Sequence, residues 1–189
     1  MNKNSIYEIV LPMLTKKRLK HTEGVRDTAL ELCEIYNVDK DKAEIASICH
    51  DIFRGKTNDE INELVLKWDL DPDRYLNNPN LAHGKLAKCF VQKELGIEDE
   101  DILNAVSYHT TGRKNMSILE KIVFIADAIE PGRDYPGVEE IRNVVAKDID
   151  HACLLSLRNT VNHLLEQGKK KEEIDIDTLE AIDYFEKEK

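Results

Sequence analysis

The sequence lacks the features that define several common classes of protein. It has no apolar run near membrane-spanning length and no signal-peptide pattern at its N-terminus, so we expect a cytoplasmic protein that does not enter a membrane. Its four cysteines lie far apart and form no CxxC pair, which argues against a structural zinc site or a disulfide framework. We expect these cysteines to be small, buried hydrophobic residues.

Acidic residues outnumber basic ones, by 37 to 27. The formal net charge is −10, which argues against a protein that binds nucleic acid non-specifically. A small phosphorylated ligand remains compatible with this charge if a local basic patch binds it. The length of 189 residues suits a single domain, residues 1–189, with a full hydrophobic core.

Strand-like alternation, internal repeats and low-complexity linkers are absent, whereas helical periodicity dominates. We predict an all-α fold with a bend near Pro12, a helix cap at Thr15, a polar loop over 69–79 and a further loop over 131–137. The predicted helices cover approximately residues 4–14, 15–36, 39–52, 58–68, 80–95, 99–110, 118–129, 137–147, 149–167 and 177 onward.

A histidine and an aspartate, His50-Asp51, stand at the end of a predicted helix that is apolar almost all round. Such a helix is expected near the centre of a fold. An ionised carboxylate at that place needs a hydrogen-bonded cation or a metal. For the dipeptide alone, however, an exposed pair at the helix end is the simpler interpretation.

Four of the six histidines fall on apolar stripes of four different helices. One such histidine is usually a core residue, but burying four imidazoles and two carboxylates together would leave many polar groups unsatisfied without a cation. Asp127 is the clearest member, because it follows the apolar run 122–126 and precedes Ala128-Ile129. We expect His151 and His163 to be exposed instead. The candidate metal ligands are His21, His50, Asp51, His83, His109 and Asp127.

The donor types narrow the choice of metal. Imidazole and carboxylate without thiolate suit iron, manganese, cobalt or catalytic zinc. Six donors fit one octahedral ion with open positions, or two ions that share a carboxylate, for which Asp51 is the natural bridge. Two ions can activate water and clamp a phosphoryl oxygen, which is hydrolase chemistry.

Basic and hydroxyl side chains flank these donors. Arg18 lies three residues before the first histidine, Arg54 follows the His-Asp pair by one turn, and Arg133 occupies the glycine-containing loop after Asp127. Each alone is more simply a solvated charge, but a neighbouring glycine lets Arg133 approach an anion closely. Thr110 and Thr111 follow His109 and could donate hydroxyls to phosphate or sugar.

The order His21 … His50-Asp51 … Asp127 resembles the H…HD…D signature of the HD superfamily of metal-dependent phosphohydrolases. With His83 and His109 between these positions, the chain resembles more specifically the YqeK-type symmetrical diadenosine tetraphosphatases. The similarity extends from Arg18-Leu19-Lys20-His21 to the tail 176–181. It includes the strings His50-Asp51-Ile52, Ala82-His83-Gly84, Tyr108-His109-Thr110-Thr111-Gly112 and Ala126-Asp127-Ala128-Ile129-Glu130-Pro131-Gly132-Arg133.

The resemblance implies a single-domain, HD-type helical bundle with a central metal site. Its implied reaction is the iron-dependent hydrolysis of diadenosine tetraphosphate to two ADP. The implied ligands of the first ion are His21, His50, Asp51 and Asp127. His83 and His109 would bind a second ion or contact substrate phosphate. The residues implied near the nucleotide are Arg18, His21, His83, His109, Thr110 and Arg133. The tail around 174–180 is expected to close over the nucleotide, and a homodimer is compatible with the resemblance.

We expect Asp51, Asp127, His83 and His109 to be the catalytic residues. In the expected mechanism, water attacks a phosphorus beside the central bridging oxygen, and Arg133 neutralises the charge that builds up. Asp51 and Asp127 hold the metal and orient the water, and either could take its proton. Three alternatives stay open: a nucleotidase for mononucleotides, a metal-containing nucleotide sensor with negligible turnover, and a helical interaction protein without metal.

Overall fold

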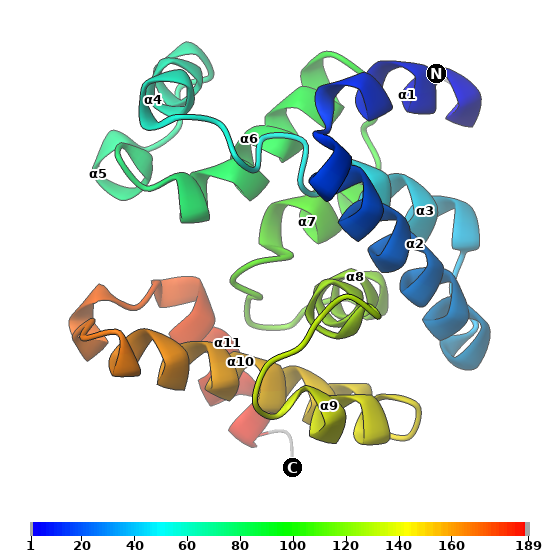
Figure 1. Ribbon diagram of the computed structural model, residues 1–189, viewed down its shortest axis with the longest axis vertical. Helices are drawn as coiled ribbons and strands as arrows, with labels where there is room; N and C mark the ends of the chain where they lie inside the picture. Colours follow the sequence, from blue (N-terminus) through cyan, green and yellow to red (C-terminus); the bar gives the residue numbers. More distant parts are fainter. Residues whose placement is uncertain (1, 188–189) are drawn as a thin grey trace.

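The computed structural model describes residues 2–187, so the outermost ends of the expected domain, residue 1 and residues 188–189, lie outside the described residues. Within this range the chain forms eleven α-helices, two short 3₁₀ helices and no strand, which confirms the predicted all-α class (Figure 1). The elements are α1 (Lys3–Val10), η1 (Leu11–Met13), α2 (Lys16–Tyr36), α3 (Lys40–Cys49), α4 (Asn58–Lys67), α5 (Pro72–Tyr75), α6 (Pro79–Lys93), α7 (Glu100–Tyr108), α8 (Ile118–Ile129), α9 (Val138–Val145), α10 (Ile149–Glu166), η2 (Lys171–Glu173) and α11 (Ile176–Lys187).

Side-chain caps explain why several helices begin where they do. The hydroxyl of Thr15 accepts a hydrogen bond from the Arg18 amide, as predicted, and Asp39 accepts from two amides at the start of α3. Ser117 and Glu120 form a reciprocal capping box that starts α8. These caps satisfy amides that have no partner inside their helices.

The segment 69–79 was wrongly predicted to be a loop throughout. It contains the one-turn helix α5, which is capped by Asp71 and begins at Pro72. Proline suits the first position of a helix because its ring fixes φ and its missing N–H would have no partner there. Tyr75 ends this turn and is buried against the core, so tertiary packing stabilises a helix too short to stand alone.

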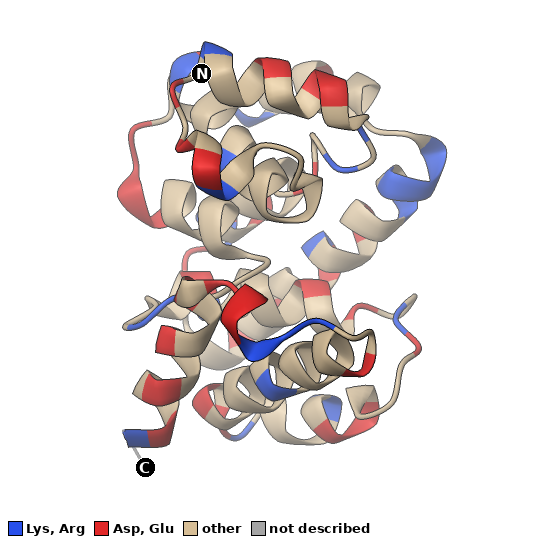
Figure 2. Ribbon diagram, turned by 90° about the vertical axis from the view of Figure 1, so that its left-hand side faces the viewer, with Lys and Arg blue, Asp and Glu red and all other residues tan. Residues whose placement is uncertain are grey.

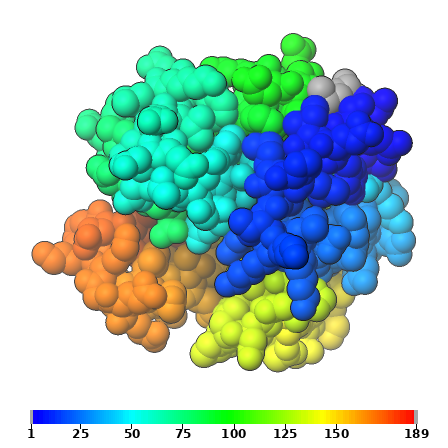
Figure 3. Space-filling model, turned by 45° about the horizontal axis from the view of Figure 1, so that its top comes forward, coloured from blue at the N-terminus to red at the C-terminus, as the bar shows by residue number. Residues whose placement is uncertain are grey.

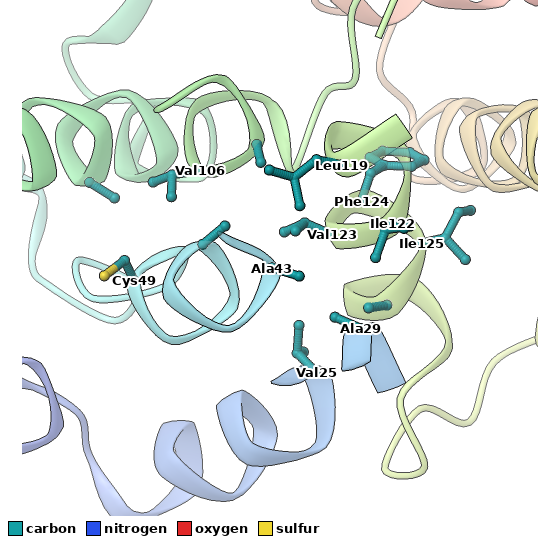
Figure 4. Close-up of a cluster of buried hydrophobic side chains, with 14 of the residues drawn as sticks. Val25, Ala29, Ala43, Cys49, Val106, Leu119, Ile122, Val123, Phe124 and Ile125 are labelled. Atoms are coloured by element: carbon teal, nitrogen blue, oxygen red, sulfur yellow. The ribbon is translucent and has the colours of Figure 1, made fainter. Parts of the chain in front are cut away.

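Helix α8 lies in the middle of the fold. It packs against α2, α3, α7, α9 and α10 and is seen nearly end-on in Figure 1. Every residue from Ile122 to Ala126 is buried, so this helix is apolar almost all round, as a central helix should be. Figure 4 shows its side chains meeting those of Val25 and Ala29 from α2 and Ala43 from α3.

The cysteines are placed largely as their sequence pattern indicated. Cys33, Cys49 and Cys153 are buried free thiols, and Cys89 is half-buried. Acidic residues, red in Figure 2, are spread over helices near both ends of the chain. Between residues 2 and 187, no helix has the length and apolar character needed to cross a membrane.

Candidate metal centre and adjoining cleft

The structure brings all six candidate ligands into one cluster. They come from α2, the turn after α3, α6, the end of α7, and α8. Around Asp51, the Nε2 atoms of His83 and His109 lie 3.3 and 3.8 Å from Oδ1. Around Asp127, the Nε2 atom of His21 lies 3.0 Å from Oδ1.

His50 connects the two halves of this cluster. Its Nε2 atom lies 3.8 Å from Oδ2 of Asp51 and 4.0 Å from Oδ1 of Asp127. Two sets of three residues place ligand atoms within 4.8 Å of one another: His21, His50 and Asp127, and His50, Asp51 and His109. His50 belongs to both sets.

Backbone carbonyls orient three of the four imidazoles. The Nδ1 atoms of His50, His83 and His109 lie 2.5, 3.1 and 2.8 Å from the carbonyl oxygens of Ser47, Pro79 and Val106, respectively. Because a carbonyl can only accept, Nδ1 carries the proton and donates it, which leaves each Nε2 lone pair directed into the cluster. At His83, where Arg54 Nη1 also lies 3.5 Å from Nδ1, the shorter contact with the carbonyl favours the same tautomer. Metal-binding histidines are commonly oriented in this way.

The polar atoms of the cluster fit a cation. His50 is fully buried, and its Nε2 atom has no hydrogen-bond partner among residues 2–187. The Nε2 atoms of His83 and His109 approach each other to 3.0 Å, a contact between two lone pairs that a positive charge would relieve. Nitrogen and carboxylate oxygen donors without sulfur suit iron, manganese, cobalt or catalytic zinc.

The pKa values of Asp51, Asp127 and His50 favour the protonation states that bind metal, whereas at His21 contacts with Asp127 and Glu130 outweigh burial and raise the pKa. Burial would raise the pKa of Asp51, but its close contacts with His50, His109 and His83 outweigh burial and hold it well below its usual range. Asp127 likewise has a pKa below its usual range, where contacts with His21 and Arg133 outweigh burial. Complete burial lowers the pKa of His50 to about 4, so its imidazole is neutral near pH 7. Ionised carboxylates and neutral imidazoles are the metal-binding forms.

Glu130 orients the fourth histidine and was missed in the sequence. The residue is 6% exposed, and Oε1 lies 3.1 Å from Nδ1 of His21. The other oxygen, Oε2, accepts a hydrogen bond of 2.5 Å from the Gly132 amide. On α2, a Cβ atom at Gly24 would lie only 2.8 Å from the same oxygen, so the carboxylate occupies the space that glycine leaves.

Two of the three candidate arginines are bound to ligand carboxylates. Arg18 Nη1 lies 2.7 Å from Asp51 Oδ2, and Arg133 pairs with the Asp127 carboxylate while its Nε donates to the Asp127 carbonyl at 2.7 Å. Arg54 is half-buried and forms no ion pair with any described residue. It is therefore the arginine of this set that is most available to an incoming anion.

A cleft of about 640 Å³ opens beside the cluster. Arg54, Thr110, Asp127 and Arg133 are among its lining residues. The opposite wall is α10, which the sequence analysis did not assign to the site; His163 is exposed, as predicted, but lines this wall. In Figure 3 the cyan segment near residue 54, the yellow loop after α8 and the orange end of α10 surround a hollow.

Other predicted residues lie outside this cleft. His151 is half-buried rather than exposed, and Thr111 is buried, with its hydroxyl donating to the Gly112 carbonyl. No residue of the segment 174–180 belongs to the cleft lining. Instead, Thr178 donates a hydrogen bond of 3.0 Å to the Thr111 carbonyl, next to Thr110.

Comparison with known proteins reveals close similarity over the whole chain. Residues 18–132 match the family model described as HD domain. A protein of Halalkalibacterium halodurans named "Bis(5'-nucleosyl)-tetraphosphatase, symmetrical" is 42% identical, covering 95% of this chain and 94% of that protein. A Bacillus subtilis protein of the same name is 39% identical over 89% and 91% of the two chains. A crystal structure from Clostridium acetobutylicum, described as a "predicted HD superfamily hydrolase involved in NAD metabolism", has a TM-score of 0.91, 39% identity and coverage of 100% and 99%.

Proposed function

The chain belongs to the HD domain family, and from this premise we propose that it hydrolyses diadenosine tetraphosphate and related dinucleoside polyphosphates symmetrically, to two nucleoside diphosphates. The names of the Halalkalibacterium and Bacillus relatives support this reaction. The observation that carries the proposal is the cluster itself. Four imidazoles and two carboxylates converge beside a cleft with basic side chains, which is an arrangement suited to phosphoryl transfer.

The cluster would hold one or two divalent cations, and iron is our proposed physiological metal. His21, His50, Asp51 and Asp127 are the proposed ligands of the first ion. His83 and His109 either bind a second ion or contact a phosphate. A bound divalent ion supplies Lewis acidity to phosphoryl transfer and neutralises part of the phosphate charge.

The remaining side chains position the phosphates and the attacking water. Asp51 and Asp127 are ionised in the free protein and orient the water toward a phosphorus next to the central bridging oxygen. The water oxygen bonds to this phosphorus as the bond from phosphorus to the bridging oxygen breaks, and the proton of the water passes to Asp51 or Asp127, so that both products are ADP. Arg54 and Arg133, with the Thr110 hydroxyl, face the phosphate groups and stabilise the charge that develops there. Arg18 acts indirectly, by holding the Asp51 carboxylate through their ion pair.

Product analysis tests this function directly. Anaerobically purified protein, supplied with ferrous iron or manganese, is incubated with diadenosine tetraphosphate, and the nucleotides are separated. We expect ADP as the sole product. AMP together with ATP would contradict symmetrical cleavage, and turnover restricted to mononucleotides would identify a nucleotidase. Tight nucleotide binding without any product from metal-loaded protein would identify a sensor.

The Asp127→Ala substitution provides the matched test of the site. Loss of this carboxylate should abolish metal retention and hydrolysis while the helical circular-dichroism spectrum remains. An active Asp127→Ala protein would contradict the proposed ligand set. A homodimer, a cytoplasmic location and a single-domain organisation over 1–189 are predictions that accompany this proposal.

A further inference from the structure

Thr110 follows the end of α7, where the chain leaves the helix and enters an irregular turn. Its hydroxyl oxygen lies 3.1 Å from Nε2 of His109 and 3.3 Å from Nε2 of His83, and the residue lines the cleft. Helix α7 ends at Tyr108. The place of the Thr110 hydroxyl beside the two imidazoles is therefore set by backbone that has no helical hydrogen bonds to fix it.

The ring of His109 is held by contacts on the helical side. Its Nδ1 atom donates to the Val106 carbonyl one turn earlier in α7. Helix α6 packs closely on the same ring, because a Cβ atom at Gly84 would lie 3.2 Å from Cε1 of His109. These contacts fix the imidazole, so the position of Thr110 depends on the contacts of the turn that follows.

Two hydrogen bonds fix this turn, residues 109–112. The Gly112 amide donates to the Tyr108 carbonyl at 2.8 Å, and the Thr178 hydroxyl donates to the Thr111 carbonyl at 3.0 Å. Thr111 and Thr178 are each 4% exposed, and no other donor among residues 2–187 pairs with the Thr111 carbonyl. Because a buried carbonyl that loses its donor is costly, the bond from Thr178 constrains the turn strongly.

Thr178 is itself anchored through the residues just before it. Arg74 on α5 donates to Asp175 from Nε at 3.0 Å and from Nη2 at 2.7 Å, and its Nη2 also donates to Asp177 at 2.7 Å. Thr178 belongs to the first turn of α11, and no residue of the segment 174–180 lines the cleft. Its hydroxyl therefore supports the turn from outside the cleft.

We propose that Thr178 is a positioning residue for the reaction. By holding the Thr111 carbonyl, it keeps the Thr110 hydroxyl beside His83 and His109. This inference rests on the proposed function, in which the Thr110 hydroxyl stabilises charge on the phosphate. A small displacement of such a group slows the chemical step more than it weakens substrate binding, so the contribution of Thr178 belongs to kcat rather than to KM.

Steady-state kinetics of manganese-loaded protein with diadenosine tetraphosphate test this role. Thr178→Val keeps the shape of the side chain but removes the donor, and it should lower kcat about tenfold while KM stays within about twofold. Thr178→Ser retains a hydroxyl and should restore kcat to within about twofold of the wild-type value. Thr28→Val, at a half-buried position on α2 outside the cleft lining, is the matched control and should change neither constant.

A double substitution separates positioning from a general loss of stability. In a Thr110→Val background the hydroxyl to be positioned is gone, so Thr178→Val should change kcat by less than about twofold. Multiplicative effects of the two substitutions would overturn the inference. So would an unchanged kcat in Thr178→Val, or a Thr178→Ser protein that is as slow as Thr178→Val.

Amide hydrogen exchange provides a readout that needs neither metal nor substrate. In metal-free protein, the Gly112 amide should exchange about tenfold faster in Thr178→Val than in the wild type, because the turn that it closes has lost its second hydrogen bond. Equal exchange in the two proteins would overturn the inference. Absence of ADP formation by the wild-type protein would instead reject the proposed reaction, and the exchange comparison would still judge whether Thr178 holds the turn.

Discussion

The position of one proton on each histidine determines what the cluster can bind. Glu130 sets this proton for His21, since Oε1 lies 3.1 Å from Nδ1. Glu130→Gln should therefore weaken metal affinity by roughly 10–100-fold, as seen for outer partners of metal ligands. Competition with a chromophoric chelator would measure the change. Glu140→Gln, at an exposed site on α9, is the control and should leave metal affinity unaltered.

The close approach of Gly24 to the Glu130 carboxylate leads to a second prediction. In most helices Gly→Ala stabilises, by about 1 kcal/mol. Here the added methyl group would meet Glu130 Oε2, so Gly24→Ala should destabilise the protein and displace Glu130 from His21. In the Glu130→Ala background the same substitution should become stabilising. Urea unfolding of the four proteins measures this coupling; independent effects of the two substitutions would contradict it.

At the residue scale, the sequence predicted the six donors because polar side chains are conspicuous within apolar stripes. Glu130 was missed because it follows the end of α8, where helical periodicity no longer assigns a direction to a side chain. The α10 wall of the cleft was missed for a different reason. This face of α10 is polar whether it borders solvent or a cleft, and the sequence pattern alone does not distinguish the two.

At the scale of elements, α9 secures the loop that carries Arg133. Arg142 donates hydrogen bonds of 3.0, 2.9 and 3.0 Å to the carbonyls of Ile129, Glu130 and Arg133. Arg142→Met should reduce the free energy of unfolding by about 1–3 kcal/mol, because charged donors contribute more than neutral ones. Chemical denaturation measures this loss. Arg158→Met, which removes an exposed ion pair with Glu186, should cost less than about 1 kcal/mol.

Most element boundaries could also be predicted, since α2 and α8 combine clear caps with long apolar stripes. One element that was not predicted, α5, has only one turn. A capping aspartate and a proline at the first position were present in the sequence, but a single turn carries no periodicity. Its helical state depends on the burial of Tyr75, which is a tertiary interaction that the local pattern does not encode.

At the scale of the whole molecule, charges join α5 and α6 to the C-terminal segment. Arg74 binds both Asp175 and Asp177, each at 2.7 Å. Lys85 lies 3.8 Å from Asp177 and 3.3 Å from the centre of the Tyr108 ring. Burial lowers the pKa of Lys85 to about 8, so keeping it charged in the folded protein costs free energy.

Replacing Lys85 should therefore stabilise the protein in a pH-dependent manner. Below pH 8 the lysine is charged in both states, and Lys85→Met should raise the free energy of unfolding by about 1–3 kcal/mol. Between pH 8 and 10.5 the unfolded chain binds more protons than the folded one, so wild-type stability rises with pH and the difference shrinks. Unfolding at pH 7 and 9.5 tests this. Lys93→Met, exposed on α6, should show no such trend; equal gains at both pH values would contradict the argument.

The six donors lie far apart in sequence, from residue 21 on α2 to residue 127 on α8. A cation that binds them all would act as a cross-link, tying five segments of the chain together with an effect that resembles a reversible disulfide. Because the unfolded chain has no preformed cluster, the free energy of binding adds to that of folding. Removing metal with a chelator should lower the melting temperature by several degrees, and restoring manganese should recover it. The Asp127→Ala protein should melt at the same temperature with and without chelator.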